Sequence, residues 1–460
     1  KEKFPLIEES MVQGGLWDPD AGLVTPRSQT VAGKLVDMAE KTGKLKPYAN
    51  TAAKSLIIEN GRIKGVETSR GTIMSDHVVV CAGIWGRLIA EMAGEDLPVM
   101  PVDHPLTFFG PYTEFAGTGK DIGYPLLRDQ GNSAYMRDTG DPTTAEGGMI
   151  EWGYYEEKNP RMVHPRDIFS KEQSSWSPSQ RDLDMEQILE PLERAIELTP
   201  ILGELGYDER RSFNGLLQVT ADGGPSCGES RKVRGLWYCV AIWVKDGPAY
   251  GKLIADWMTD GRTEVDHAKI DYARFYDHQL TEDFIAGRCF ETGQKIYTPA
   301  VHPREPFGNG RNIKRSPFYE REKALGGYFM ELGGWERAHG YAANEHLLET
   351  YGDRVPVREN EWDNRHFWRV SNAEHLAMSD DVGMVNLSHF YIFDVEGPDH
   401  VDAMEWICAA KIGGDANIGK GIYTHFLDDQ GMVRADLTVI RMADRCRVID
   451  GADAGPRDLL

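Results

Sequence analysis

The sequence is poor in cysteine and contains no long apolar run. Six cysteines are scattered through 460 residues without a C-x-x-C pair, a pattern typical of reduced thiols rather than of a disulfide framework or a zinc site. No apolar stretch approaches the ~20 residues that a membrane-spanning helix needs. The first residues, KEKFPLIEES, contain neither the apolar core of a secretion signal nor a basic, serine-rich transit pattern. We therefore predict a soluble protein of a reducing compartment, the cytoplasm.

Positive charge is also in short supply. The chain has 51 lysines and arginines against 73 aspartates and glutamates, which gives a formal net charge of −22. A surface this negative repels nucleic-acid backbones and anionic lipids, so neither nucleic acid nor a membrane is an expected partner. The remaining composition, with 41% hydrophobic residues, 49 glycines and 24 prolines, is that of a loop-rich globular enzyme. The length accommodates two to four domains of ~100–200 residues.

Several common catalytic and cofactor motifs are missing. The sequence has no H-E-x-x-H spacing, so no metal site is predicted, and it has no G-x-S-x-G elbow of a serine hydrolase. It also lacks a G-x-G-x-x-G loop between a strand and a helix, the mark of a dinucleotide-binding fold near its start. The residues alone leave two interpretations open: the chain has no such site, or it starts inside the domain that contains it.

Turn and periodicity signals predict a mixed α/β chain. Asn60-Gly61 between two apolar runs predicts a tight hairpin turn. The continuous apolar run His77–Cys81 predicts a strand covered on both faces. A second buried strand is predicted over 236–244. The residues 246–261 after it predict a helix that ends before Gly261.

The middle of the chain differs from the rest in amino-acid composition. Residues 101–211 are aromatic, polar and rich in glycine, with one clear amphipathic helix in MEQILEPLERAIELTP, where Ile188, Leu192 and Ala195 share a face. A polar, arginine-rich connector follows over roughly 262–316, and a further globular unit begins near Ser316-Pro317.

Three stretches resemble a known enzyme family, and they occur in the order that the family has. SFNGLLQVTADGGPSCGES with GLWYCVAIWVKDGPAYGKLIADWMTDG is similar to the end of the flavin fold of amine oxidases such as D-amino-acid, sarcosine and dimethylglycine oxidases. LGGYFMELGGWERAHGYAANEHLL resembles the entry to the folate domain of dimethylglycine oxidase and dehydrogenase. YTHFLDDQGMVRADLTVIR resembles the tetrahydrofolate-binding core of those enzymes and of the glycine-cleavage aminomethyltransferase.

The resemblance implies a multidomain chain of α/β and α+β type. Residues 1–265 would form an FAD-binding, Rossmann-like oxidoreductase domain without its N-terminal βαβ unit, with a β-rich substrate subdomain at about 101–211. Residues 266–316 would be a connector, and 317–460 the N-terminal part of a folate-binding aminomethyltransferase-like domain. The chain would thus be a piece truncated at both ends, and the absent glycine loop would precede its first residue.

For the flavin half, the resemblance assigns active-site roles to His104 and Tyr135. Oxidation of an N-methyl amine needs the nitrogen lone pair, so a nearby proton acceptor is useful, and the ordinary pKa of histidine, ~6.5, suits that role. The residues alone favour a simpler interpretation, because most single histidines are surface or core groups and a tyrosine in a strand usually packs. The resemblance also places FAD contacts at Trp243, Val244, Lys245, Asp246 and Gly247, between a strand and a helix N-terminus, and at Ala53 on the adenine side.

For the folate half, Asp436 matches the family's active-site aspartate, which steadies positive charge near the reacting nitrogens, and Tyr423 matches a residue that packs on the folate. The implied reaction is FAD-dependent oxidative demethylation of dimethylglycine or sarcosine, with the one-carbon unit passed to tetrahydrofolate as 5,10-methylenetetrahydrofolate. Electrons would leave to oxygen or to a carrier protein. Two alternatives stay open: a folate-dependent transferase with a structural flavin-like domain, and a non-catalytic fragment or assembly subunit.

Overall fold

The computed structural model describes residues 1–24, 27–145, 147–169, 177–297, 301–302, 305–362, 365 and 368–451. Two units make up the chain: the first contains Lys1–Arg262 and Ile285–Val301, and the second contains Thr263–Phe284 and His302–Leu460. Across the described ranges, no helix is both long and apolar enough to cross a membrane.

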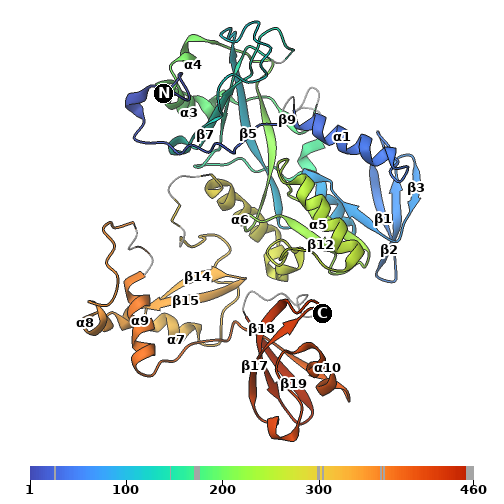
Figure 1. Ribbon diagram of the computed structural model, residues 1–460, viewed down its shortest axis with the longest axis vertical. Helices are drawn as coiled ribbons and strands as arrows, with labels where there is room; N and C mark the ends of the chain where they lie inside the picture. The colour runs from blue at the N-terminus through green and yellow to red at the C-terminus, as the bar shows by residue number, and fades with distance from the viewer. Residues whose placement is uncertain are drawn as a thin grey trace. The chain divides into compact units, whose positions relative to one another are not determined.

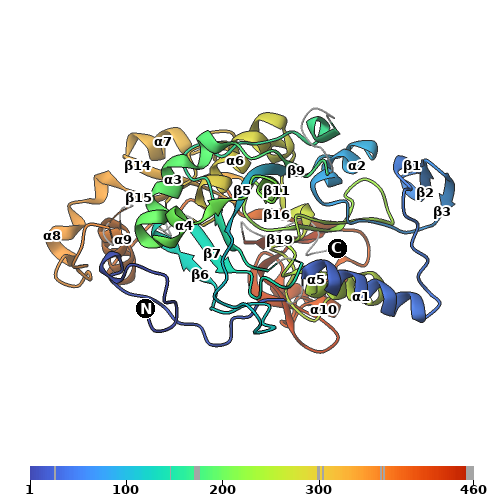
Figure 2. The same cartoon turned by 90° about the horizontal axis from the view of Figure 1, so that it is seen from above.

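An antiparallel sheet of seven strands is the largest element of the first unit. Its order is β6-β7-β8-β5-β11-β9, with β10 also paired to β5. The long strands β5 and β11 lie side by side (Figure 2). The strands are β5 (Val99–Gly110), β6 (Leu127–Asp129), β7 (Ala134–Asp138), β8 (Ile150–Tyr154), β9 (Gln180–Arg181), β10 (Gly206–Tyr207) and β11 (Phe213–Thr220).

Helices α3 (Met185–Leu198) and α4 (Ile201–Glu204) pack on this sheet. The predicted face of α3 is confirmed, because Ile188, Leu192 and Ala195 are all buried in one cluster with Trp152 of β8. Asp184 caps α3 by accepting a hydrogen bond from the backbone N–H of Glu186. The resulting core holds β7 and β8 in a fixed place, and these two strands position the site described below.

A smaller sheet, of order β12-β13-β4, contains a strand from each of the two predicted apolar runs, but the prediction that the first strand is covered on both faces is wrong, because Val79 is 38% exposed. Its strands are β4 (Val78–Val80), β12 (Ser226–Glu229) and β13 (Leu236–Val240), and β13 pairs with β4 in parallel. The predicted strand over 236–244 is too long, because Ala241 takes a left-handed conformation with φ of +60° and ends the ladder at Val240. Helix α2 (Gly86–Met92) follows β4, and α5 (Gly247–Asp260) follows β13 and is closed by Gly261 in the left-handed conformation.

The start of the first unit is a helix and a meander. Helix α1 (Ser28–Lys41) has no buried residue. Strands β1 (Ala53–Glu59), β2 (Arg62–Thr68) and β3 (Gly71–Met74) form their own antiparallel sheet (Figure 1). The predicted hairpin turn is confirmed, since Asn60 and Gly61 both have positive φ, of 51° and 71°.

Helix α6 (Glu282–Lys295) lies in the stretch predicted to be a connector, and its residues from Ile285 onward belong to the first unit. The buried thiol of Cys289 lies 3.6 Å from the carbonyl oxygens of Pro98 and of Val219, so α6 packs on the end of the β5–β11 pair. The chain leaving α6 thereby brings Tyr297 to the same sheet.

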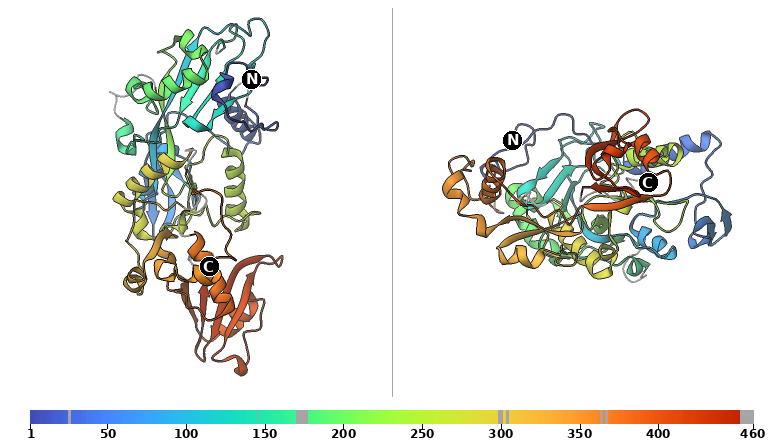
Figure 3. Two further views of the ribbon diagram at one scale, coloured as in Figure 1. Left: turned by 90° about the vertical axis from the view of Figure 1, so that its left-hand side faces the viewer. Right: turned by 90° about the horizontal axis from the view of Figure 1, so that it is seen from below.

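Among its described residues, the second unit contains a hairpin, the α-helices α7, α8 and α9, and a four-stranded sheet with helix α10 against it (Figure 3). The sheet has the order β16-β19-β18-β17, and Met404 of α10 is buried with Leu437, Val439 and Val448 on one of its faces. The elements are α7 (Tyr319–Ala324), β14 (Gly327–Leu332), β15 (Trp335–Tyr341), α8 (Leu347–Tyr351), α9 (Trp368–Asp380), β16 (Tyr391–Glu396), α10 (His400–Ile407), β17 (Gly421–Leu427), β18 (Val433–Arg441) and β19 (Arg445–Asp450).

Candidate active site

His104 and Tyr135 lie together although 31 residues and one strand separate them. His104 is on β5 and Tyr135 on β7, and β8 runs between these two strands. The Nε2 atom of His104 is 2.8 Å from the hydroxyl oxygen of Tyr135, which is hydrogen-bond distance. The structure therefore brings together the two residues that the sequence resemblance assigned to the flavin half.

Gly153 of β8 makes this contact sterically feasible. Gly153 pairs with Tyr135 on one side and with Leu106 of β5 on the other. A Cβ atom built on Gly153 would overlap Cζ and the hydroxyl oxygen of Tyr135. The missing side chain thus lets the tyrosine ring extend across β8 toward His104.

Burial keeps both members of the pair uncharged. His104 is 9% exposed, and its pKa is lowered to about 4, first by desolvation and then by the positive charge of Arg128. A backbone hydrogen bond to Tyr154 opposes this shift. Burial also raises the pKa of the Tyr135 hydroxyl well above its ordinary value. At neutral pH the pair is a neutral imidazole and a neutral phenol, and His104 is a weaker base than its ordinary pKa would suggest.

A row of aromatic rings leads from this pair to the end of β13. The ring of Tyr155 lies 4.4 Å from that of His104, measured between centroids, and 4.3 Å from that of Tyr297. The ring of Tyr297 in turn lies 5.8 Å from that of Trp243. These distances are typical of aromatic contacts, so the rings form one continuous wall.

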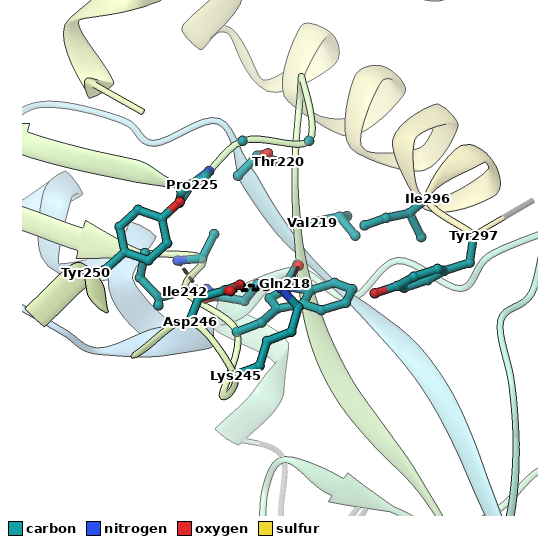
Figure 4. Close-up of a pocket in the computed structure, with 14 residues that line it drawn as sticks. Gln218, Val219, Thr220, Pro225, Ile242, Lys245, Asp246, Tyr250, Ile296 and Tyr297 are labelled. Carbon is teal, nitrogen blue, oxygen red and sulfur yellow. Dashed lines mark hydrogen bonds and ion pairs between the residues drawn. The ribbon is translucent and has the colours of Figure 1, made fainter. Parts of the chain in front are cut away.

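A pocket of about 230 Å³ opens at the far end of this wall. Figure 4 shows Tyr250 of α5 and Tyr297, which follows α6, on opposite sides of it. The rest of the lining comes from β11, from the turn between β11 and β12, from the segment after β13, and from Ile296 next to Tyr297. The lining residues are Gln218, Val219, Thr220, Gly223, Gly224, Pro225, Ala241, Ile242, Trp243, Lys245, Asp246, Tyr250, Ile296 and Tyr297.

The side chain of Gln218 fixes two turns beside the pocket. Its Oε1 accepts a hydrogen bond of 2.9 Å from the backbone N–H of Ala241, and its Nε2 donates to the carbonyl of Gly83. The backbone carbonyl of Gln218 accepts from the indole N–H of Trp243, also at 2.9 Å. The chain therefore leaves β13 in a conformation that is rare for alanine because β11 holds it there.

The predicted FAD contacts divide into two groups. Trp243, Lys245 and Asp246 line the pocket, whereas Val244 is 74% exposed and Gly247, the first residue of α5, is not in the lining. The ammonium group of Lys245 lies 2.7 Å from the Asp246 carboxylate, and this hydrogen bond raises the pKa of Lys245.

The N-terminus of α5 lies beside the pocket, whereas Ala53, predicted to contact the adenine side of FAD, does not. Helix α5 begins without a side-chain cap, so the N–H groups of its first turn keep hydrogen-bonding capacity beside the pocket. Ala53 is exposed at the start of β1 and does not line the pocket.

In the second unit, Tyr423 and Asp436 lie on adjacent strands of the four-stranded sheet. Asp436 of β18 is directly opposite His425 of β17, and Tyr423 is two residues before His425. A hydrogen bond to the Asp436 carboxylate raises the pKa of the Tyr423 hydroxyl. The rings of Tyr423 and His425 are 5.4 Å apart. Both predicted folate residues are therefore together on an exposed face, with His425 beside them.

Sequence reasoning did not find Gly153, Tyr155, Gln218 or Tyr297. Gly153 and Tyr155 lie in the aromatic stretch GMIEWGYYEE, where nothing distinguishes a glycine that makes room for another strand's side chain. Tyr297 follows a helix inside the predicted connector. Their roles depend on strand order, and periodicity does not reveal that.

Comparison with family models divides the chain into three consecutive matches. Residues 1–257 match the model described as FAD dependent oxidoreductase. Residues 260–316 match the FAD dependent oxidoreductase central domain, and residues 318–458 match the GCVT N-terminal domain.

Curated relatives match the chain along nearly its whole length. The 4-methylaminobutanoate oxidase (formaldehyde-forming) of Paenarthrobacter nicotinovorans is 30% identical over 457 residues, covering 98% of this chain and 51% of the relative. The mitochondrial sarcosine dehydrogenase of Mus musculus is 27% identical over 467 residues, covering 96% and 48%. The mitochondrial pyruvate dehydrogenase phosphatase regulatory subunit of Mus musculus is 26% identical over 454 residues, also covering 96% and 48%.

The chain therefore spans about half the length of the curated relatives that it matches. The order of the three domain matches confirms the resemblance predicted from the sequence. Because the first model covers more than half of its residues, the protein belongs to the FAD dependent oxidoreductase family, and its second half contains a GCVT N-terminal domain.

Proposed function

We propose that the protein oxidises an N-methyl amine, sarcosine or dimethylglycine, with FAD as cofactor, and that the one-carbon unit passes to tetrahydrofolate. The observation that carries the proposal is the neutral His104–Tyr135 pair, which a wall of aromatic rings connects to the pocket between β13 and α5. Dimethylglycine differs from sarcosine only by a second methyl group on the same nitrogen.

The pocket residues fit one end of FAD. A volume of about 230 Å³ is smaller than the roughly 300–1,000 Å³ of pockets that enclose drug-sized ligands, so this pocket suits a ring system and not a whole dinucleotide. Trp243 and Tyr297 offer aromatic surface, and Lys245, which is paired with Asp246, places a positive charge in the lining. The uncapped N-terminus of α5 adds N–H donors and a favourable dipole for negative charge.

When bound, FAD supplies an acceptor for the hydride that leaves the methyl carbon next to nitrogen. The protein's own contribution is to keep that nitrogen uncharged, because only a free lone pair assists the loss of hydride. A neutral, buried His104 and the nearby cation Arg128 both disfavour a second positive charge. We therefore expect the pKa of a bound amine to be lower than its pKa in water.

The hydrogen bonds of His104 suggest which atom of the His104–Tyr135 pair donates and which accepts. We assign the ring proton of His104 to the nitrogen that faces the backbone of Tyr154, because that backbone hydrogen bond raises the pKa of His104. With one ring nitrogen acting as donor, Nε2 accepts from the Tyr135 hydroxyl. The phenolic oxygen keeps its lone pairs free to accept a hydrogen bond from the N–H group of uncharged sarcosine, whereas uncharged dimethylglycine, a tertiary amine, has no N–H to donate. In this role Tyr135 orients the amine, and His104 orients Tyr135.

The second step is assigned to the exposed sheet face of the second unit. The oxidised amine is an iminium ion, which water converts to formaldehyde unless another nucleophile takes the carbon first. Asp436 would steady positive charge near the folate nitrogens, and Tyr423, hydrogen-bonded to it, would offer a flat surface for the folate ring. The match of residues 318–458 to the GCVT N-terminal domain supports this assignment.

Anaerobic reduction of the flavin tests the first step. In the purified protein reconstituted with FAD, we expect sarcosine or dimethylglycine to bleach the visible flavin absorbance. Y135F and H104Q should slow this reaction by about 10²–10³-fold, because each removes one partner of the orienting hydrogen bond. Y48F, at a tyrosine that is 63% exposed, is the matched control. Equal rates in Y135F, H104Q and the wild type would remove the pair from the mechanism.

Product analysis tests the second step. With the wild-type protein we expect less free formaldehyde when tetrahydrofolate is present than when it is absent. D436N should release the same amount of formaldehyde under both conditions while the flavin is reduced at the wild-type rate. Formaldehyde release that does not respond to folate in the wild type would contradict the proposed transfer.

A non-catalytic subunit is the second candidate function. The relative named as a pyruvate dehydrogenase phosphatase regulatory subunit has the same coverage of this chain as the sarcosine dehydrogenase, so this architecture also occurs in a protein named for regulation. Failure of the reconstituted protein to bind FAD, together with no turnover of either amine, would favour this candidate.

A further inference from the structure

Three cysteines lie next to one another across the small sheet β12-β13-β4. Cys227 of β12 is directly opposite Cys239 of β13. On the other side of β13, Tyr238 pairs in parallel with Val80, so Cys239 and Cys81 are the next neighbours in register. Adjacent strands are ~4.7–4.9 Å apart, which is within the ~4.4–6.8 Å between α-carbons that a disulfide spans. The sheet therefore holds neighbouring thiols at a separation that one bond can close.

The three thiols form a chain of hydrogen bonds. The hydrogen bond to Cys239 is the largest cause that raises the pKa of the Cys81 thiol well above its ordinary value. A hydrogen bond to Cys227 raises the pKa of Cys239 to about 12, and the contact with Cys81 opposes this shift. The sulfur atoms of neighbouring strands are therefore in contact, and Cys81 and Cys239 are both protonated at neutral pH.

Solvent reaches the three thiols to different degrees. Cys81 is exposed, Cys239 is half-buried, and Cys227 is completely buried. The indole ring of Trp257 on α5 packs against that of Trp237, two residues before Cys239 on the same face of β13, with 5.5 Å between the ring centroids. Helix α5 thus covers this face of β13, whereas Cys81 directly follows β4 and stays open to solvent. An oxidant in solution meets Cys81 first, with Cys239 in contact behind it.

The thiols also lie beside the pocket of the candidate site. Tyr250 lines this pocket, and its pKa is raised mainly by burial and then by the nearby thiols of Cys227 and Cys239. Electrostatic effects of this kind weaken with distance, so the tyrosine and the thiols are close neighbours. A chemical change at the thiols would therefore act at the pocket wall.

Cys81 and Cys239 stand at the base of the two turns that Gln218 connects. Gly83 and Ala241 each follow one of these cysteines by two residues. The carbonyl of Gly83 accepts a hydrogen bond from Nε2 of Gln218, and the N–H of Ala241 donates to its Oε1. A bond between the two sulfur atoms would join the same turns covalently.

We propose that Cys81 and Cys239 form a modification site for hydroperoxides, which convert the two thiols into a disulfide that locks the turns beside the pocket. In the first step, the Cys81 sulfur takes one oxygen atom of hydrogen peroxide and becomes a sulfenic acid, and the other oxygen leaves as water. The Cys239 sulfur then attacks the Cys81 sulfur, and the hydroxyl group leaves with the Cys239 proton as a second water. Two thiols are oxidised by two electrons, and one peroxide is reduced to two waters.

The hydrogen bonds between the thiols set the speed of this reaction. The thiolate is the reactive form, and a thiol that is held protonated supplies little of it. We therefore expect oxidation to need hours of exposure to peroxide rather than seconds. The proposal goes beyond the proposed function and does not depend on it, because the peroxide is added in the test.

Thiol counting and peptide mass spectrometry test the modification. After hours in hydrogen peroxide, the wild type should lose two of its six thiols, contain a peptide that joins Cys81 to Cys239, and recover both thiols in dithiothreitol. C81S should lose no thiol, and C239S should lose only that of Cys81, as a sulfenic acid that dimedone traps. C408S, at a cysteine of the second unit, is the matched control and should behave as the wild type.

Amide hydrogen exchange tests the locking of the turns. In the oxidised wild type, the segments after β4 and β13 should exchange at least about 10-fold more slowly than in the reduced protein, because the disulfide limits their local opening. The same treatment should leave exchange in C81S unchanged. Intact thiols in the treated wild type, a bond between Cys239 and Cys227 instead, or unchanged exchange in the cross-linked protein would each overturn the proposal. None of these readouts needs bound flavin or amine turnover.

Discussion

Two tyrosines, one in each unit, have a raised pKa for different physical reasons. Tyr135 in the first unit is raised mainly by burial, beside a histidine whose own pKa is lowered to about 4. Tyr423 in the second unit is 64% exposed and is raised by its hydrogen bond to the Asp436 carboxylate. The pKa of Tyr135 is therefore raised by the buried environment of the whole site, whereas the pKa of Tyr423 is raised by one neighbouring side chain, Asp436.

The two causes reflect two kinds of site, a buried one in the first unit and an exposed one in the second. In the first unit, the packing of β5, β7 and β8 creates a buried site in which His104 and Tyr135 are both neutral at neutral pH. In the second unit, the sheet only places side chains next to one another at an exposed face. We therefore expect substitutions of buried small residues to disturb the first region strongly, and substitutions of single polar partners to act locally in the second.

Among substitutions outside the His104–Tyr135 pair itself, G153V is expected to have the largest effect. The added side chain would occupy the space of the Tyr135 ring and separate its hydroxyl from His104. A displacement of about 1 Å costs on the order of 10² in rate, so amine-dependent flavin reduction should fall by about 100-fold. G33A, at an α1 glycine with no atom within 4 Å of the added Cβ, is the control and should keep the wild-type rate. A wild-type rate in G153V would show that the close approach of the two side chains is not needed.

The next effect is on stability at acid pH. The folded pKa of His104, about 4, lies below the ordinary value of about 6.5, so the unfolded chain binds the proton first as the pH falls. The contribution of His104 to the free energy of unfolding is complete above about pH 6.5 and is lost toward pH 4, by roughly 3 kcal/mol. Denaturant unfolding of the wild type and H104Q at pH 7 and pH 4.5 measures it.

H104Q removes this titration, so its stability should depend less on pH over that window than the wild type's. H77Q, at an exposed histidine, should follow the wild type. Identical pH dependence in H104Q and the wild type would mean that the histidine is not desolvated.

The smallest effect is expected at the exposed face. D436N removes the carboxylate that raises the pKa of Tyr423, so the pKa of this hydroxyl should fall toward its ordinary value of about 10. Unfolding stability should change by no more than about 0.5 kcal/mol, as at other exposed sites. Spectrophotometric titration of D436N against the double variant D436N/Y423F isolates this tyrosine. A pKa that stays raised in D436N would assign the shift to burial and weaken the contrast between the two units.

Local signals in the sequence predicted much of the fold. Asn60-Gly61 specified its turn because both residues tolerate positive φ, and the face of α3 followed from the spacing of Ile188, Leu192 and Ala195. The strand after Leu236 was predicted four residues too long, because apolar residues continue past the point where Ala241 turns out of the sheet.

The site was only partly accessible from the sequence. His104, Tyr135 and Trp243 came from resemblance, and nothing in their local sequence separates them from packing residues. Tyr155 and Tyr297, which connect them, are 142 residues apart and meet only because α6 returns to the sheet. Gly153 acts through the strand next to it. Such contacts are set by strand order and chain reversal, which no local pattern encodes.

One amide side chain coordinates the two loops that follow β4 and β13. Gln218 reaches the carbonyl of Gly83 after β4 and the N–H of Ala241 after β13, using both ends of its carboxamide at once. Glutamate, of nearly the same shape, would keep the acceptor and lose the donor, so it would release one loop and retain the other. Q218E, which replaces one nitrogen atom by oxygen, would therefore remove one of the two hydrogen bonds that connect chain segments 158 residues apart in the sequence.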